Sequence, residues 1–73
     1  MQRFGEKLRI LRTSRQMTLK ELASVLGLTA HGYISEMEAG KKKPTAEFVL
    51  KVARYFKVTT DQLLKDELEV EGK

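Results

Sequence analysis

The chain has no cysteine and no tryptophan, and its 73 residues include only one histidine and one proline. Without cysteine it has neither a disulfide framework nor a thiolate metal site, which fits a reducing cytoplasm. A single histidine does not supply a metal cluster of the usual ligand spacing. The serines lack a nucleophile-elbow setting, and no glycine-rich phosphate loop is present. We therefore expect neither an enzyme nor a bound cofactor.

Long hydrophobic runs are also missing, since the longest apolar stretches span only a few residues. A membrane helix needs about 20 such residues, so we expect no membrane association. The composition is 41% hydrophobic and 33% charged, which is typical of a small globular domain rather than a disordered chain. We expect one domain over residues 1–68 and a frayed tail over 69–73.

Charge is unevenly distributed along the chain. Residues 1–57 contain 12 Lys/Arg and 5 Asp/Glu, which sum to +7, whereas residues 58–73 contain 2 and 5, which sum to −3. A basic body suggests a polyanionic partner, although many small domains are basic for solubility alone.

Hydrophobic periodicity and capping signals predict five helices. Phe4, Leu8 and Leu11 mark the buried face of a helix over about residues 2–16, and its basic residues are expected to project elsewhere: Lys7, Arg9, Arg12 and Arg15. Thr18 and Glu21 form a capping box for a second helix that ends at Gly27. Thr29 is the expected N-cap of a third helix, which should end near residues 39–40.

The second half continues the helical pattern. Thr45 should cap a fourth helix, whose apolar stripe is Val49, Val52, Ala53 and Phe56. Thr59 and Gln62 form another capping box, which opens a fifth helix carrying Leu63 and Leu64. Short connections between five short helices predict a compact all-α bundle.

Residues 18–38 read as two short helices joined by a tight turn at Gly27. Small Ala23 would allow the second of these helices to cross closely over the first, and Ile34 and Met37 would anchor it to the core. The opposite face is then exposed and polar: His31, Ser35 and Glu36, with Tyr33 at its border. This is the layout of a helix-turn-helix whose second helix faces a DNA groove.

The ordered motifs resemble the Cro/repressor-like helix-turn-helix DNA-binding domains, also called the xenobiotic-response-element type. The resemblance covers about residues 5–65 and rests on this ordered set of segments: residues 5–9, 11–12, 17–18, 21–23, 26–28, 34–35, 38–40, 43–44, 51–53 and 58–59. It implies a lambda-repressor-like fold of five helices, cytoplasmic use with prokaryotic DNA, and a homodimer that regulates transcription from an inverted repeat, with repression as the expected output.

Three positions depart from the pattern of that family. The segment between Gly27 and Glu38 is one residue longer than usual, which leaves the register of the third helix open by one position. Leu19 stands where many members carry a phosphate-binding glutamine. Lys57 replaces the usual Gly or Asn at the end of the fourth helix, and a positive φ there would cost about 1 kcal/mol.

The candidate base-reading residues lie at the start of the third helix and along its outer face: Ala30, His31, Gly32, Tyr33 and Glu36. His31 could donate to or accept from a base edge, or be a surface turn residue without a role. Tyr33 could bond a phosphate or contact a thymine methyl group, or steady the helix as a partly buried aromatic residue. Glu36 could accept from cytosine, or pair with a nearby lysine. Gly32 could permit close approach to DNA, or the helix could simply begin there.

The candidate phosphate contacts surround this helix: Thr18, Lys20, Thr29, Ser35, Lys41, Lys42 and Lys43. For the three consecutive lysines the alternative is a solvated charge run. By the resemblance, Arg12 and Glu38 form a structural ion pair between the first and third helices.

A homodimer is expected because one module buries too little surface for tight DNA binding. The candidate dimer surface is apolar and lies at the C-terminal end: Leu64, Leu68 and Val70. The second hypothesis is an antitoxin-like or adaptor module that keeps the fold and binds a protein partner. A third is non-specific nucleic-acid binding.

Overall fold

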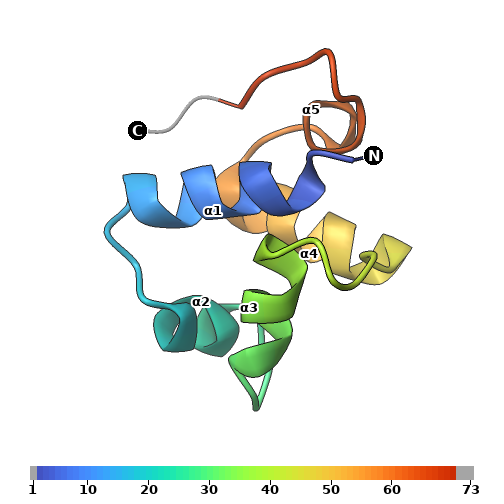
Figure 1. Ribbon diagram of the computed structural model, residues 1–73. Coiled ribbons are helices and arrows are strands. Elements are labelled where there is room, and N and C mark those ends of the chain that lie inside the picture. The colour runs from blue at the N-terminus through green and yellow to red at the C-terminus, as the bar shows by residue number, and fades with distance from the viewer. Residues whose placement is uncertain (1, 71–73) are drawn as a thin grey trace.

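The computed structural model describes residues 2–70. These residues contain five α-helices. They are α1 (Phe4–Ser14), α2 (Leu19–Val25), α3 (Gly32–Glu38), α4 (Ala46–Phe56) and α5 (Thr60–Leu64). In Figure 1, α2 and α3 lie below α1, whereas α5 and the C-terminal segment lie on its other side. No strand occurs within residues 2–70. The predicted all-α, five-helix class is confirmed.

Side-chain caps begin three of the helices as the sequence predicts. Thr18 and Glu21 form a complete capping box at α2, and Thr59 and Gln62 form another at α5. The Thr45 hydroxyl accepts from the Phe48 N–H at the start of α4. The prediction for Thr29 is wrong, because α3 begins only at Gly32 and has no side-chain cap. The connection between α2 and α3 is therefore a loop over residues 26–31.

Glycines close the ends of α2 and α3. Gly27 and Gly40 have φ values of 76° and 77°. The backbone N–H groups that follow reach back into the helices: Leu28 donates to the Ala23 carbonyl, and Lys41 to that of Glu36. These bonds turn the chain sharply on either side of α3, and so fix where that helix begins and ends in space.

Two other helix ends use the same left-handed conformation without glycine. Gln16, after α1, has φ 56°, and Lys57, after α4, has φ 57°. The positive φ considered for Lys57 is therefore present, and Gln16 is a second such position. A non-glycine residue in this region is strained by about 1–2 kcal/mol.

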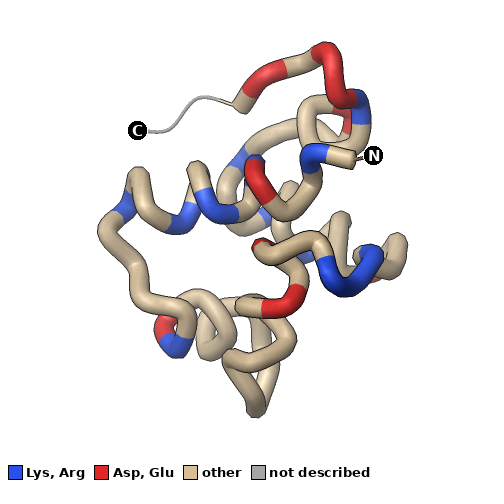
Figure 2. Tube along the Cα trace, viewed as in Figure 1, with Lys and Arg blue, Asp and Glu red and all other residues tan. Residues whose placement is uncertain are grey.

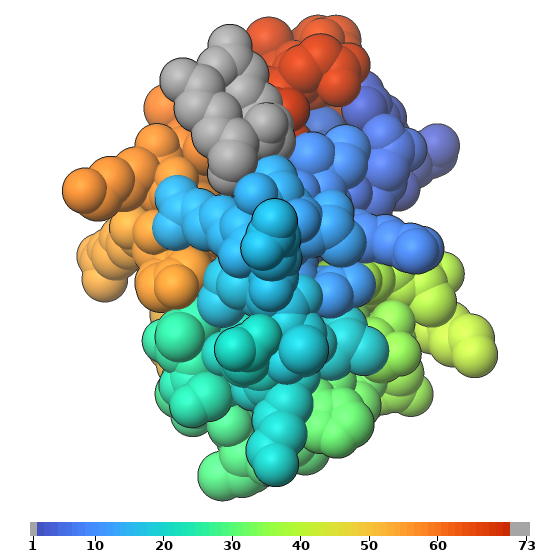
Figure 3. All heavy atoms as spheres, turned by 90° about the vertical axis from the view of Figure 1, so that its left-hand side faces the viewer, coloured from blue at the N-terminus to red at the C-terminus, as the bar shows by residue number. Residues whose placement is uncertain are grey.

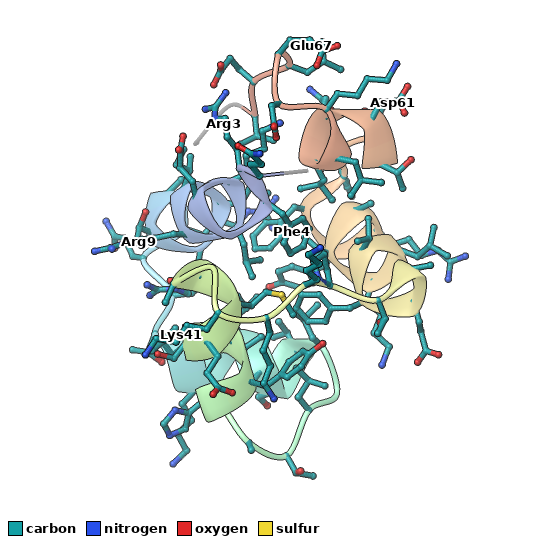
Figure 4. All side chains as sticks on the ribbon, turned by 45° about the vertical axis from the view of Figure 1, so that its right-hand side comes forward. Arg3, Phe4, Arg9, Lys41, Asp61 and Glu67 are labelled. Carbon is teal, nitrogen blue, oxygen red and sulfur yellow. The ribbon has the colours of Figure 1, made fainter. Side chains whose placement is uncertain are left out.

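The core lies where α1, α3 and α4 meet. Phe4, Leu8 and Leu11 of α1 are buried, as are all four residues of the predicted α4 stripe. Phe4 and Phe48 pack edge to face with their ring centroids 6.0 Å apart. Figure 4 shows Phe4 directed into the interior and Arg9 directed outward from the same helix.

Lys7 corrects the sequence analysis, because it does not project into solvent. Its side chain is fully buried, and Nζ donates to the carbonyl oxygens of Gln62 and Lys65 at 2.5 and 2.6 Å. Position 7 lies between Phe4 and Leu11 on the buried side of α1. The positive charge is tolerated there because it meets the free carbonyl groups at the negative end of α5.

The C-terminal segment folds back onto the start of α1. The Asp66 carboxylate accepts from the backbone N–H groups of Gln2 and Arg3, and the Arg3 guanidinium binds Glu69 with two hydrogen bonds of 2.8 and 2.9 Å. Val70 is 8% exposed. Within the tail that was expected to fray, residues 69–70 thus pack against the rest of the chain, and residues 71–73 lie outside the described residues.

Candidate nucleic-acid interface

Helix α3 has one buried side and one exposed side, as predicted. Ile34 and Met37 are 0% and 1% exposed and anchor the helix to the core. The other side is open to solvent at His31, Ser35 and Glu36. Tyr33 is half-buried between the two sides. The exposed side is polar.

An ion pair fixes α3 to α1. Arg12 Nε donates to Glu38 Oε2 at 2.7 Å, Nη2 donates to Oε1 at 3.1 Å, and Nη1 donates to the Met17 carbonyl at 2.7 Å. The side chains of the pair are 14% and 8% exposed. The pKa of Arg12 is raised above its ordinary value because its guanidinium donates hydrogen bonds to Glu38. The expected structural pair is present, and it also holds the chain that leads into α2.

Gly5 permits α1 to approach the end of α3. A Cβ at this position would collide with the Met37 carbonyl oxygen and lie 2.9 Å from that of Glu38. In the sequence, Gly5 stood out only as part of residues 5–9, a segment that carries the family resemblance. The signal in the sequence is a glycine within a predicted helix, which costs about 1 kcal/mol relative to alanine and so indicates a packing reason.

Tyr33 and Glu36 are held in place by neighbours rather than left free. The Tyr33 ring meets Phe48 edge to face at 5.3 Å, and Lys42 Nζ lies 5.6 Å from its centroid. Lys42 Nζ also lies 3.4 Å from Glu36 Oε1. Tyr33 thus packs as a partly buried aromatic residue, and Glu36 pairs with a nearby lysine. These two roles were the alternatives to a DNA contact. Both residues still border the exposed side of α3.

The candidate phosphate contacts surround α3 on the surface. Lys20 is exposed at the start of α2, Thr29 is exposed in the loop before α3, and the loop of Lys41, Lys42 and Lys43 follows α3 directly. The base-reading candidate Ala30 is exposed next to Thr29. Figure 2 shows these three lysines as one basic stretch of chain, and Figure 4 places Lys41 beside α3. The Thr18 side chain caps α2, because its hydroxyl oxygen accepts from the Glu21 N–H.

Acidic groups gather at the opposite end of the molecule. Figure 2 shows the acidic C-terminal segment on the far side of α1 from the α2–α3 turn. The view in Figure 3 separates the same two regions, with α2 and α3 at one end and the C-terminal segment at the other. The acidic C-terminal segment is therefore kept away from the exposed side of α3, where Glu36 is the exposed acidic residue.

Other kinds of site find no support among residues 2–70. No group of three His, Cys, Asp or Glu side chains is placed to hold a metal ion there. None of the helices in this part of the chain has the length and apolar character needed to cross a membrane. The candidate site is therefore the polar side of α3 together with the loop of Lys41, Lys42 and Lys43.

A family model described as Helix-turn-helix matches residues 8–63. The chain belongs to the helix-turn-helix family. The resemblance seen in the sequence is thereby confirmed. A solved structure, the restriction-modification controller protein C.AhdI from Aeromonas hydrophila, has a TM-score of 0.75 to this helix-turn-helix protein at 28% identity. The match covers 86% of this chain and 94% of that one.

Several curated relatives are transcriptional regulators. The SPbeta prophage-derived uncharacterized HTH-type transcriptional regulator YonR of Bacillus subtilis (strain 168) is 39% identical over 62 residues, which are 85% of this chain and 56% of YonR. The HTH-type transcriptional activator BcrR of Enterococcus faecalis is 39% identical over 64 residues, and the repressor RghR of B. subtilis is 38% identical over 65. Each match covers 88% of this chain, but 31% of BcrR and 47% of RghR. The chain thus spans about half or less of the length of these relatives.

The candidate dimer residues of this helix-turn-helix protein differ in exposure. Leu68 is 37% exposed and Leu64 is half-buried. Val70 is buried in the core of its own chain, so its expected place on a dimer surface is wrong. Its burial follows from the fold-back of the C-terminal segment, which sequence periodicity did not indicate because that segment is not helical.

Proposed function

We propose that the protein is a sequence-specific regulator of transcription that inserts the exposed side of α3 into the major groove of double-stranded DNA. The observation that carries this proposal is the construction of α3. It is anchored by Ile34 and Met37, fixed by the Arg12–Glu38 pair, and left polar and open on the other side. A major groove accepts one α-helix, so this construction suits it.

Base recognition is assigned to the N-terminal part of α3 and the loop before it. His31 can donate to or accept from a base edge, and Glu36 can accept from a cytosine amino group. Tyr33 can contact a thymine methyl group or a phosphate. Ala30 and Gly32 would permit close approach because their side chains are small, and the space around Gly32 is open.

Phosphate contacts are assigned to the residues around α3. Lys41 and Lys43 are exposed in the loop after it, and Lys20 is exposed on α2. Each phosphate neutralised should add about 0.9 to the slope of log K against log salt. The hydroxyl groups of Thr29 and Ser35 could donate to phosphates between these cations.

We further propose that two copies bind an inverted repeat. The protein measures 30 × 25 × 19 Å, so two adjacent copies can present their α3 helices to half-sites about 34 Å apart. We propose a dimer surface near α5, away from α3, and the exposure of Leu68 and the half-burial of Leu64 support this choice. Repression is the output that we propose, since occupation of an operator by the dimer is sufficient to block access to it.

Selection of bound sequences from a random duplex pool tests the proposal, followed by titration of the selected duplex at two salt concentrations. A palindromic consensus and a falling affinity with added salt are expected. His31→Ala should reduce discrimination between sites by about 1–3 kcal/mol. No binding to any duplex at low salt would favour the protein-interaction module, and binding without a consensus would favour non-specific association.

A further inference from the structure

Lys42 differs from its two neighbours in the lysine loop. Its Nζ lies 3.4 Å from Glu36 Oε1 and 5.6 Å from the centroid of the Tyr33 ring. Both partners border the exposed side of α3, from which base contacts are proposed. One cation therefore contacts two candidate base-reading side chains at the same time.

The backbone at the end of α3 brings Lys42 to this place. Gly40 has φ 77°, and the Lys41 N–H donates to the Glu36 carbonyl at 2.9 Å. These two features reverse the chain just after the helix. Lys42 thereby comes back alongside the helical turn that carries Glu36, instead of continuing away from α3.

Tyr33 is supported from the protein side as well. Its ring meets Phe48 edge to face, with 5.3 Å between centroids and 85° between planes. Phe48 is 4% exposed and packs in turn on Phe4. The tyrosine ring thus has a fixed aromatic contact beneath it and a cation over its face, which restricts the directions that its hydroxyl can take.

The charge of Lys42 has a second consequence, at Glu36. The Glu36 side chain is 48% exposed, and without a cation beside it the carboxylate would repel DNA phosphates. An ion pair this exposed adds little to fold stability. Its main effect is therefore expected on binding, where it lets a carboxylate enter a strongly negative groove.

Resting on the function proposed above, we infer that Lys42 is a positioning residue for sequence recognition. It neutralises Glu36 and holds the Tyr33 ring, so that both side chains meet base edges in one arrangement. Lys41 and Lys43 act on phosphates and carry no sequence information. Of the three consecutive lysines, one therefore positions base-reading side chains and two bind phosphates.

The test compares Lys42→Ala with the matched control Lys43→Ala, using the selected operator and its single-base-pair variants. The control should weaken all duplexes by one common factor of about two to five. Lys42→Ala should weaken the operator about tenfold and reduce its preference over some variants about three- to tenfold. Lys42→Arg, which keeps the charge and the ring contact, should preserve that preference.

A double-mutant cycle isolates the contact with Glu36. Adding Glu36→Gln to Lys42→Ala should restore affinity to within about threefold of Glu36→Gln alone, because the unpaired carboxylate is then gone. Independent effects of the two substitutions, or a uniform loss across all duplexes with Lys42→Ala, would overturn the inference.

A measurement on the free protein separates this inference from the proposed function. The NMR resonances of the Tyr33 ring should move in Lys42→Ala and stay in place in Lys43→Ala. Unmoved resonances would show that Lys42 does not hold the ring, whatever the protein binds. Moved resonances in a protein that binds no duplex at low salt would overturn the DNA-binding function, and with it the recognition role.

Discussion

Replacing Arg12 by alanine should destabilise the protein strongly without changing which DNA it prefers. The substitution removes two hydrogen bonds to Glu38 and one to the Met17 carbonyl. It also leaves the Glu38 carboxylate, 8% exposed, without its cation. Breaking one partner of a buried pair costs about 3–5 kcal/mol, because the remaining charge is uncompensated. A domain of this length has a total stability of about 4–11 kcal/mol.

Urea unfolding followed by circular dichroism measures this loss. With a slope of about 1 kcal/mol/M, this loss should lower the midpoint by about 3–5 M. Adding Glu38→Gln should recover part of the loss, whereas the control Arg9→Ala, at an exposed position of the same helix, should leave the midpoint nearly unchanged. A loss below about 1 kcal/mol, or no recovery in the double variant, would refute the assigned role.

Three further substitutions test other parts of the structure. Gly5→Ala should destabilise the fold by about 1–3 kcal/mol and weaken DNA binding, because the new Cβ meets the Met37 carbonyl; urea unfolding and duplex titration measure the two effects. Lys57→Gly should raise the unfolding free energy by about 1 kcal/mol, because φ there is 57°; no gain would show that the position is unstrained. The pKa of Asp66 is lowered from 3.8 by hydrogen bonds from the backbone of Arg3 and then of Gln2. The stabilisation by Asp66 is therefore present above pH 3.8 and lost as the pH falls through the lowered value. Asp66→Asn should make the free energy of unfolding less dependent on pH in that acid range. An unchanged pH dependence of this free energy would contradict the assignment.

Sequence patterns predicted well those features that depend on neighbouring residues. The threonine caps of α2, α4 and α5, the glycine at the end of α2 and the α4 stripe each depend on spacings of three or four residues, and all are present. The two sides of α3 were also predictable, because Ile34 and Met37 alternate with polar residues at helical spacing.

The features that were missed depend on distant parts of the chain. The burial of Lys7 requires carbonyl groups from residues 62 and 65, and the burial of Val70 requires the C-terminal segment to return to α1. The start of α3 was placed too early because Thr29 has the side chain of a cap but not the local geometry. Pairing of Glu36 with a lysine was considered from the sequence, but which lysine returns to α3 depends on the turn at Gly40, which brings back Lys42.

Methylation interference on the selected operator tests the central claim most directly. Methyl groups on guanine N7 lie in the major groove, and those on adenine N3 lie in the minor groove. If α3 enters the major groove, N7 methylation at the centre of each half-site should abolish binding, and His31→Ala should weaken that effect locally. Interference confined to adenine N3 would contradict the account.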